Sequence, residues 1–214
     1  MKLPKTWLSY ARPAITTPYP LFPENVFSGN KNNGIELAGN ASGVTVDPNI
    51  VGLNTKGNGV LPNGGDGLLI DGTAHGNIIG GTLHSVIPQN TFSGNAGYGV
   101  VITGRAYGNH VFRSFIGTQI LGVNALGNKQ GGVLISGDAH ANLIGLATLT
   151  PADLISGNTG IGVTLTSGTQ RNSVINNYIG LNRLDHFLRN SGAAVVNAGH
   201  DNTIRGNWTR PAPH

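Results

Sequence analysis

Apolar residues recur at fixed distances from a glycine in six successive segments of the chain, and this pattern predicts short β-strands. The segments start at Gly34, Gly67, Gly99, Gly132, Gly162 and Gly192. The residues one and three positions after each glycine are apolar, a period of two that is typical of a strand with one buried face. Another apolar residue follows twelve positions after each glycine: Val46, Ile79, Val111, Ile144, Val174 and Ile204. Units of this length stack on their neighbours in a solenoid, because none can bury its apolar face alone.

Glycine and asparagine mark the corners between the predicted strands. Gly39, Gly72, Gly104 and Gly137 close the first strand of their segments, where the backbone must turn sharply. Asparagine recurs ten positions after the glycine in five segments, at Asn77, Asn109, Asn142, Asn172 and Asn202. Stacked asparagines hydrogen-bond along such a column and hold the turns in place. We therefore interpret these five residues as a structural ladder rather than as ligands.

A longer repeat of about 65 residues is superimposed on the shorter one. Alternate segments carry Ile-Val-Gly-Leu-Asn from residue 50, Phe-Ile-Gly-Thr from 115 and Tyr-Ile-Gly-Leu-Asn from 178. Ser-Gly-Asn occupies residues 28–30, 93–95 and 156–158 in the intervening positions. The repeating unit is therefore a pair of turns.

The pattern predicts an all-β fold, a single-stranded right-handed parallel β-helix with about six coils of 30–33 residues. The right hand is expected because crossovers between parallel strands are right-handed in nearly every case. We place the β-helix at residues 24–208 and a short tail at 209–214. Residues 1–23 read as an irregular proline-rich lead-in that caps the first coil, since an uncovered end exposes sheet edges. The other end has no closing element, so the chain is either a fragment of a longer protein or a module that stacks end to end.

Several short strings resemble those of a known family. Ile-Ser-Gly-Asn at 155–158, Gly-Val-Leu-Ile-Ser-Gly at 132–137 and Asn-Ile-Ile-Gly-Gly at 77–81 resemble the right-handed parallel β-helix repeat proteins of the pectin-lyase-like superfamily. The likeness is greatest to the Asn/Gly-rich bacterial secreted and surface type. It implies an extracellular or cell-surface location, although no signal peptide is visible in this chain. It does not select an activity, because the superfamily includes lyases, hydrolases, epimerases and non-enzymatic surface proteins.

Composition and charge exclude several function classes. The formal net charge is +4, but the thirteen basic residues are scattered, which argues against a nucleic-acid partner. The chain has no cysteine, so disulfides and thiolate metal sites are excluded. No stretch approaches the length of about eighteen apolar residues that a membrane span requires. We therefore predict no membrane span and no cofactor.

Candidate chemistry lies in the column eight residues after the glycine, in a turn expected to face solvent. It reads Ser42, His75, Tyr107, His140, Gln170 and His200. The histidines lie two turns apart, roughly 9.6 Å at a strand spacing of about 4.8 Å, which is too far to share a metal ion. They are either ordinary polar turn residues or a ridge that binds an extended polysaccharide. In the second interpretation His75, Tyr107, His140 and His200 stack on sugar rings and hydrogen-bond to hydroxyl groups.

Arg105 and Asp138 lie two residues before Tyr107 and His140 in neighbouring turns. They form either a surface ion pair or, together with Tyr107 and His140, a catalytic patch. The resemblance implies that an enzyme of this type on uronate polymers needs a cation near the carboxylate and a base near C5. Arg105 would be that cation, and His140 or Tyr107 the base.

Two functions therefore remain open. The favoured one is a non-catalytic module of a secreted or cell-surface protein, a structural scaffold or spacer that contacts carbohydrate. The alternative is a polysaccharide-active enzyme, a uronate-polymer lyase or epimerase. The shortage of acidic residues and of long loops favours the non-catalytic module.

Overall fold

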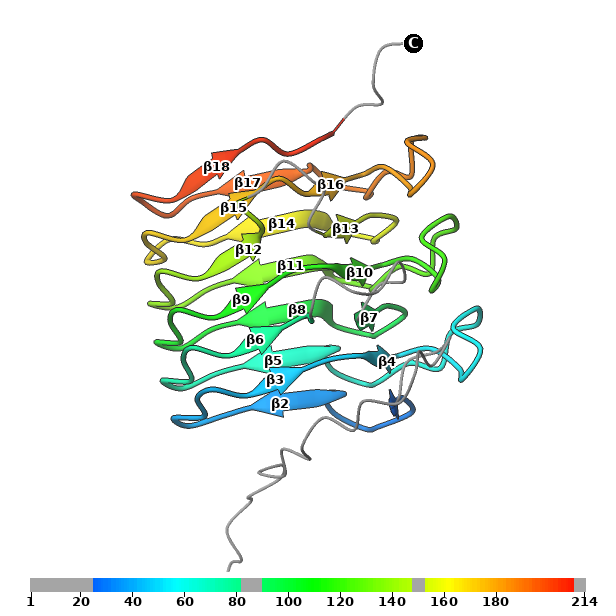
Figure 1. The fold of residues 1–214 in the computed structure, drawn as a ribbon, viewed down its shortest axis with the longest axis horizontal. Helices are drawn as coiled ribbons and strands as arrows, with labels where there is room; N and C mark the ends of the chain where they lie inside the picture. Colours follow the sequence, from blue (N-terminus) through cyan, green and yellow to red (C-terminus); the bar gives the residue numbers. More distant parts are fainter. Residues whose placement is uncertain (1–24, 82–89, 148–152, 210–214) are drawn as a thin grey trace, which may run out of the picture.

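A computed structural model describes residues 25–81, 90–147 and 153–209. Within these ranges the regular secondary structure consists of β-strands alone. The strands form three parallel sheets of six strands each, and the chain visits the three sheets in a constant order (Figure 1). This arrangement confirms the predicted all-β class and is consistent with a parallel β-helix. The predicted lead-in at 1–23 lies outside the described residues, as does the tail beyond residue 209.

Each sheet takes every third strand. The first sheet contains β1 (Asn25–Phe27), β4 (Asn49–Val51), β7 (Asn90–Phe92), β10 (Ser114–Ile116), β13 (Leu154–Ile155) and β16 (Tyr178–Ile179). The second contains β2 (Ile35–Leu37), β5 (Leu68–Ile70), β8 (Tyr98–Ile102), β11 (Gly131–Ile135), β14 (Ile161–Leu165) and β17 (Val195–Asn197). The third contains β3 (Thr45–Val46), β6 (Ile78–Ile79), β9 (His110–Val111), β12 (Leu143–Gly145), β15 (Ser173–Ile175) and β18 (Thr203–Arg205).

The predicted apolar columns form the core between the sheets. Ile70, Ile102 and Ile135 are paired in register and are completely buried. In the third sheet, Val111 pairs with Ile144 and Ile144 with Val174, again with no exposed surface. Burial of one aliphatic side chain per column and turn stabilises the rod in proportion to its length.

The last turn departs from the predicted repeat. Val163 pairs with Val195 and Leu165 with Asn197, so the residue equivalent to Gly162 is Ala194. The predicted start at Gly192 is therefore wrong by two residues. The register returns at the next corner, where Gln170 bridges His200, because that corner is two residues shorter. The sequence concealed this shift, since Val195 is apolar and satisfies either alignment.

The predicted asparagine ladder is confirmed. The Nδ2 atoms of Asn77, Asn109, Asn142 and Asn172 each donate to Oδ1 of the next member, at 2.9, 3.0, 3.0 and 3.1 Å, and Asn202 is the last acceptor. The backbone N–H groups of the same residues donate to the same oxygen atoms. Each inner asparagine thus ties its own turn to the following one.

A second asparagine ladder was not predicted. It runs through Asn30, Asn63, Asn95, Asn128, Asn158 and Asn190, with Nδ2 to Oδ1 distances of 2.8 to 3.0 Å. Each member lies four residues before the start of a turn, including Asn190 before Ala194. This spacing supports the corrected register of the last turn, and it was visible in the sequence once that register was known.

Candidate functional site

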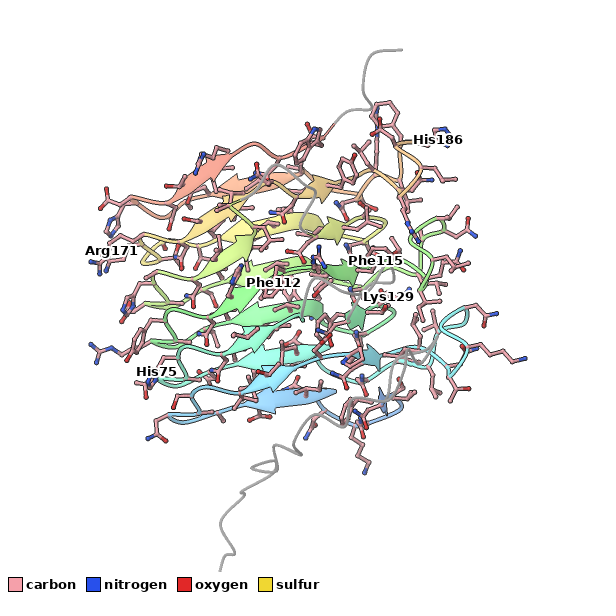
Figure 2. The ribbon with its side chains drawn as sticks, viewed as in Figure 1. His75, Phe112, Phe115, Lys129, Arg171 and His186 are labelled. Atoms are coloured by element: carbon pink, nitrogen blue, oxygen red, sulfur yellow. The ribbon has the colours of Figure 1, made fainter. Side chains whose placement is uncertain are left out.

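The column that the sequence singled out forms a continuous line on one corner of the molecule. Successive members are joined by parallel bridges, from Ser42 to His75, Tyr107, His140, Gln170 and finally His200. His75 and Arg171 mark this corner in Figure 2, on the side opposite the loop that carries His186. We call His75, Tyr107, His140 and His200 the ridge. The prediction that equal offsets lie above one another therefore holds for these residues.

Three ridge side chains stack ring on ring. The Tyr107 ring lies 4.7 Å from the His75 ring with an interplanar angle of 0°, and 5.3 Å from the His140 ring at 7°. The two imidazoles thus cover both faces of the Tyr107 ring. A sugar cannot stack on a face that is already covered, so Tyr107 can meet a ligand only through its edge and its hydroxyl group. For Tyr107, this geometry limits the predicted glycan contact to hydrogen bonds from the ring edge and the hydroxyl group.

The imidazole rings of His75 and His140, which we call the inner histidines, are each held by a hydrogen bond within their own turn. Nδ1 of His75 lies 3.0 Å from the carbonyl oxygen of Thr73, and Nδ1 of His140 lies 3.0 Å from that of Asp138. Because a carbonyl oxygen only accepts, Nδ1 carries the proton in each ring. A neutral ring then presents the lone pair of Nε2, which accepts a hydrogen bond or a proton.

His200 lies apart from the stacked rings. Gln170 occupies the intervening turn, and the Nδ1 atom of His200 lies 3.1 Å from Oδ2 of Asp201. Both side chains are well exposed, so this contact contributes little to stability. In the described part of the chain, no group of three or more His, Cys, Asp or Glu residues is placed to hold a metal ion.

The predicted catalytic patch is only partly assembled. Tyr107 and His140 are in contact, and Arg105 and Asp138 lie exposed on the same corner. The structure describes both Arg105 and Asp138 and contains no ion pair between them, so the first of the two alternatives, a surface ion pair, is not formed. An exposed pair gains little by ordering two side chains, which explains why both extend into solvent.

A pocket in the described structure lies away from the corner that carries the predicted catalytic patch. That pocket, of about 310 Å³, lies beside the last turn and is lined by residues that include Ile179, Phe187 and Arg189. None of the predicted catalytic residues lines it. Of the other carboxylates near a strand, Asp66 accepts a hydrogen bond from the backbone N–H of Tyr98 at 2.7 Å. Burial raises the pKa of Asp66, an effect that this hydrogen bond opposes.

A buried carboxyl group escaped the sequence reasoning. Asp153 is 3% exposed, and burial raises the pKa of its side chain to about 7, although the hydrogen bond from the Ser114 N–H acts in the opposite direction. It belongs to a third polar column, in the first sheet, with Asn25, Asn49, Asn90, Ser114, Asn177 and Asn207. The spacing along this column alternates between short and long steps, which hides it from a search at a constant period.

Comparison with known proteins does not identify a relative, since no family model, curated protein or solved structure matches the chain. The described residues also include no helix of the length and apolarity needed to cross a membrane.

Proposed function

We propose that the chain is a non-catalytic β-helix module of a secreted or cell-surface protein, which acts as a scaffold or spacer and contacts polysaccharide through the ridge. In this proposal the coil is right-handed, has six turns, and is of the pectin-lyase-like type. The hand follows from the general preference of parallel crossovers. The type and the location rest on the sequence strings that resemble that superfamily.

The observation that carries the proposal is the state of the ridge side chains. Each inner histidine is held by a carbonyl of its own turn, and Tyr107 is held between two rings. These contacts leave a straight row of hydrogen-bonding edges, Nε2, hydroxyl and Nε2, at the spacing of the strands. A row of this kind suits an extended polar chain lying along the rod, with few side-chain rotamers to freeze on binding.

An enzyme acting on uronate polymers is the second candidate. It is favoured by one observation: His140 has its Nδ1 proton fixed, so Nε2 is available as a base beside Tyr107. Arg105 would then neutralise the substrate carboxylate from the neighbouring position. The exposure of Arg105 and Asp138 weighs against this candidate, because preorganised and desolvated groups give the larger catalytic effects.

We also propose that the module stacks end to end on another copy through its last described turn. Ile204 is 37% exposed, whereas the equivalent residues Val174 and Ile144 are completely buried. Asn190 and Asn207 each donate Nδ2 to a carbonyl of the preceding turn, but not to a following asparagine. A turn of the stacked copy would bury Ile204 and accept hydrogen bonds from the remaining side-chain N–H groups of Asn190 and Asn207.

Binding and turnover are separated by one experiment. The purified chain is passed over immobilised alginate, pectate and neutral glycans, while a parallel sample is monitored for the ultraviolet absorbance of unsaturated uronates. We expect retention on at least one glycan without absorbance growth, and loss of retention in Tyr107→Ala and His140→Ala. His186→Ala, an exposed histidine on the opposite side, is the matched control and should bind normally. Absorbance growth that His140→Ala abolishes would establish the enzyme instead, and no retention on any glycan would refute the ridge as a binding surface.

A further inference from the structure

Three hairpin loops project from one side of the rod, at alternate turns (Figure 1). They span residues 53–61, 118–126 and 181–188, and each is closed at its base by an antiparallel bridge: Leu53 with Val60, Thr118 with Ala125, and Leu181 with Phe187. The loops recur once in every two turns, so they account for the longer sequence repeat of about 65 residues. We call the three together the loop rib.

The loops support one another and form a continuous feature along the rod. The backbone N–H of Ile120 donates to the carbonyl of Gly57 at 3.0 Å, and that of Arg183 donates to the carbonyl of Gly122 at 2.9 Å. Ile120 also packs with Ile50 and Leu53 in a small buried cluster beneath the loops. The loop rib is therefore built on a fixed base, and its tips keep a constant spacing.

The loop rib exposes an unusual share of apolar surface. Among the described residues, ten large hydrophobic side chains are exposed, and half of them belong to these three loops. They are Val60, Leu61, Leu121, Leu184 and Phe187, each exposed by between 47% and 59%. Leu121 and Leu184 occupy equivalent positions at the tips of the second and third loops, and Lys56 takes that position in the first.

Basic residues accompany these apolar tips. The three loops and the residue that follows the third contain Lys56, Arg183 and Arg189, against a single acidic residue, Asp185. The guanidinium carbon of Arg189 lies 4.5 Å from the centre of the Phe187 ring. Lys129, next to the base of the second loop, is exposed (Figure 2), and neither it nor Lys56 forms an ion pair in the structure.

We infer that the loop rib docks on a surface of anionic lipid, with Leu121 and Leu184 entering the interface and the basic residues meeting phosphate groups. Leu121 and Leu184 stand at the tips of their loops on the same side of the rod, so both can reach a planar, deformable surface together. A second copy of the chain is a poor occupant, because its loop rib carries the same positive charge. A polysaccharide would leave the leucines without apolar partners. Apolar insertion combined with electrostatic attraction is the usual basis of binding at a lipid interface.

Vesicle sedimentation tests this inference with the full chain. Vesicles of phosphatidylcholine alone are compared with vesicles containing equal parts of phosphatidylcholine and phosphatidylglycerol. We expect sedimentation only with the anionic vesicles and a steady loss of binding as salt is added, because salt screens the phosphate contacts. The double variant L121S/L184S should bind anionic vesicles at least about tenfold more weakly than the wild type, because two inserting apolar side chains are removed.

Two controls make the result specific. Ile78→Ser removes a side chain that is 44% exposed on β6, away from the loops, and should leave vesicle binding unchanged. The pair K56E/K129E should abolish binding, whereas K56R/K129R should retain it. All of the substituted positions are exposed, so the thermal unfolding temperature of each variant should stay close to that of the wild type. This measurement shows, independently of vesicle binding, that each variant is folded.

Three outcomes would overturn the inference. The first is equal binding to both kinds of vesicle, and the second is unchanged binding by L121S/L184S. The third is self-association in the absence of lipid that L121S/L184S abolishes, which would assign the loop rib to contacts between copies.

Discussion

Asp153 and Asn177 occupy successive positions of one buried polar column, and each retains a side-chain oxygen atom without a hydrogen-bond partner. Leu154 pairs with Tyr178, which places the residues before them, Asp153 and Asn177, on neighbouring strands. The unbonded atoms are Oδ2 of Asp153 and Oδ1 of Asn177. In the two asparagine ladders, the amide Nδ2 of one residue donates to Oδ1 of the next. A proton on Oδ2 of Asp153 supplies the donor that this pattern requires.

The pairing predicts that the stability of the protein falls as pH rises toward neutrality. Burial raises the pKa of Asp153 from the ordinary 3.8 to about 7, so the folded state binds this proton more tightly than the unfolded state. The contribution of Asp153 to stability is complete below pH 3.8 and is lost as pH rises through about 7. Asp153→Asn carries an N–H donor at every pH. We expect it to stabilise the protein by about 1–3 kcal/mol above neutral pH, the usual cost of a buried polar group left unsatisfied.

Denaturant unfolding on both sides of the transition measures this effect. Asp153→Asn should match the wild type only below about pH 3.8, and its advantage in the free energy of unfolding should grow as pH rises to about 7. Asp138→Asn is the matched control, because Asp138 is exposed and should show no such difference between the two conditions. If Asp153→Asn destabilises the protein in mild base, Asp153 does not depend on a proton for its place in the column.

The ladders predict a steep dependence of stability on position. Asn142 is 1% exposed, accepts hydrogen bonds from the backbone and side chain of Asn109, and donates to the Ala106 carbonyl and to Asn172. Asn142→Ala leaves these buried partners unsatisfied, so we expect a loss of about 3 kcal/mol or more in the free energy of unfolding.

Asn202→Ala is the comparison within the same ladder. Asn202 is half-buried and accepts from Asn172, but it has no following asparagine to which it donates. Its removal should cost clearly less than that of Asn142, about 1 kcal/mol, in the same unfolding measurement. Equal losses at the two positions would show that the ladder acts through its individual turns rather than as a continuous column.

The core could be predicted from sequence because burial imposes a rule that is local and periodic. Ile70, Ile102 and Ile135 follow from one offset repeated at nearly constant spacing, and the structure pairs them as expected. The position of Ala194 could not be found in this way, since the alignment on Gly192 keeps the apolar pattern, whereas the observed one places polar Asn197 opposite Leu165. The strand pairing of Val163 with Val195 and the place of Asn190 in the second asparagine ladder distinguish the two alignments.

The sequence predicted which residues of the candidate site lie above one another, but not how their side chains are arranged. Equal offsets placed His75, Tyr107 and His140 on one corner, as the bridges between them confirm. Offsets carry no information about side-chain rotamers, so the covering of the Tyr107 ring by its neighbours was not foreseen. The loop rib was likewise not foreseen, because the hydrogen bonds that join its members connect residues about two turns apart.

Ala141 offers a test of backbone strain at the ridge corner. It has a φ of 54°, in the left-handed region, whereas Gly43, Gly76 and Gly108 occupy the corresponding positions of earlier turns. An L-residue pays about 1–2 kcal/mol in this conformation, so Ala141→Gly should stabilise the protein by about 1 kcal/mol once the greater entropy of unfolded glycine is included. Ala96→Gly, at an exposed position outside the left-handed region, should instead be neutral or destabilising in the same assay.

The recurring Ile-Gly pair of the two-turn repeat can be tested in the same way. Gly117 has a φ of 101°, and a Cβ atom built on it would lie 2.3 Å from the Ser156 carbonyl oxygen and 2.4 Å from Oδ1 of Asn158. Gly180 occupies the equivalent place with a φ of 83°, but its nearest neighbour would be 3.7 Å away. Both alanine variants carry the conformational cost of about 1–2 kcal/mol. Only Gly117→Ala also forces two packed turns apart, so it should cost at least about 2 kcal/mol more than Gly180→Ala in the free energy of unfolding. Equal costs would mean that conformation alone, and not the close approach of the next turn, requires glycine at this position.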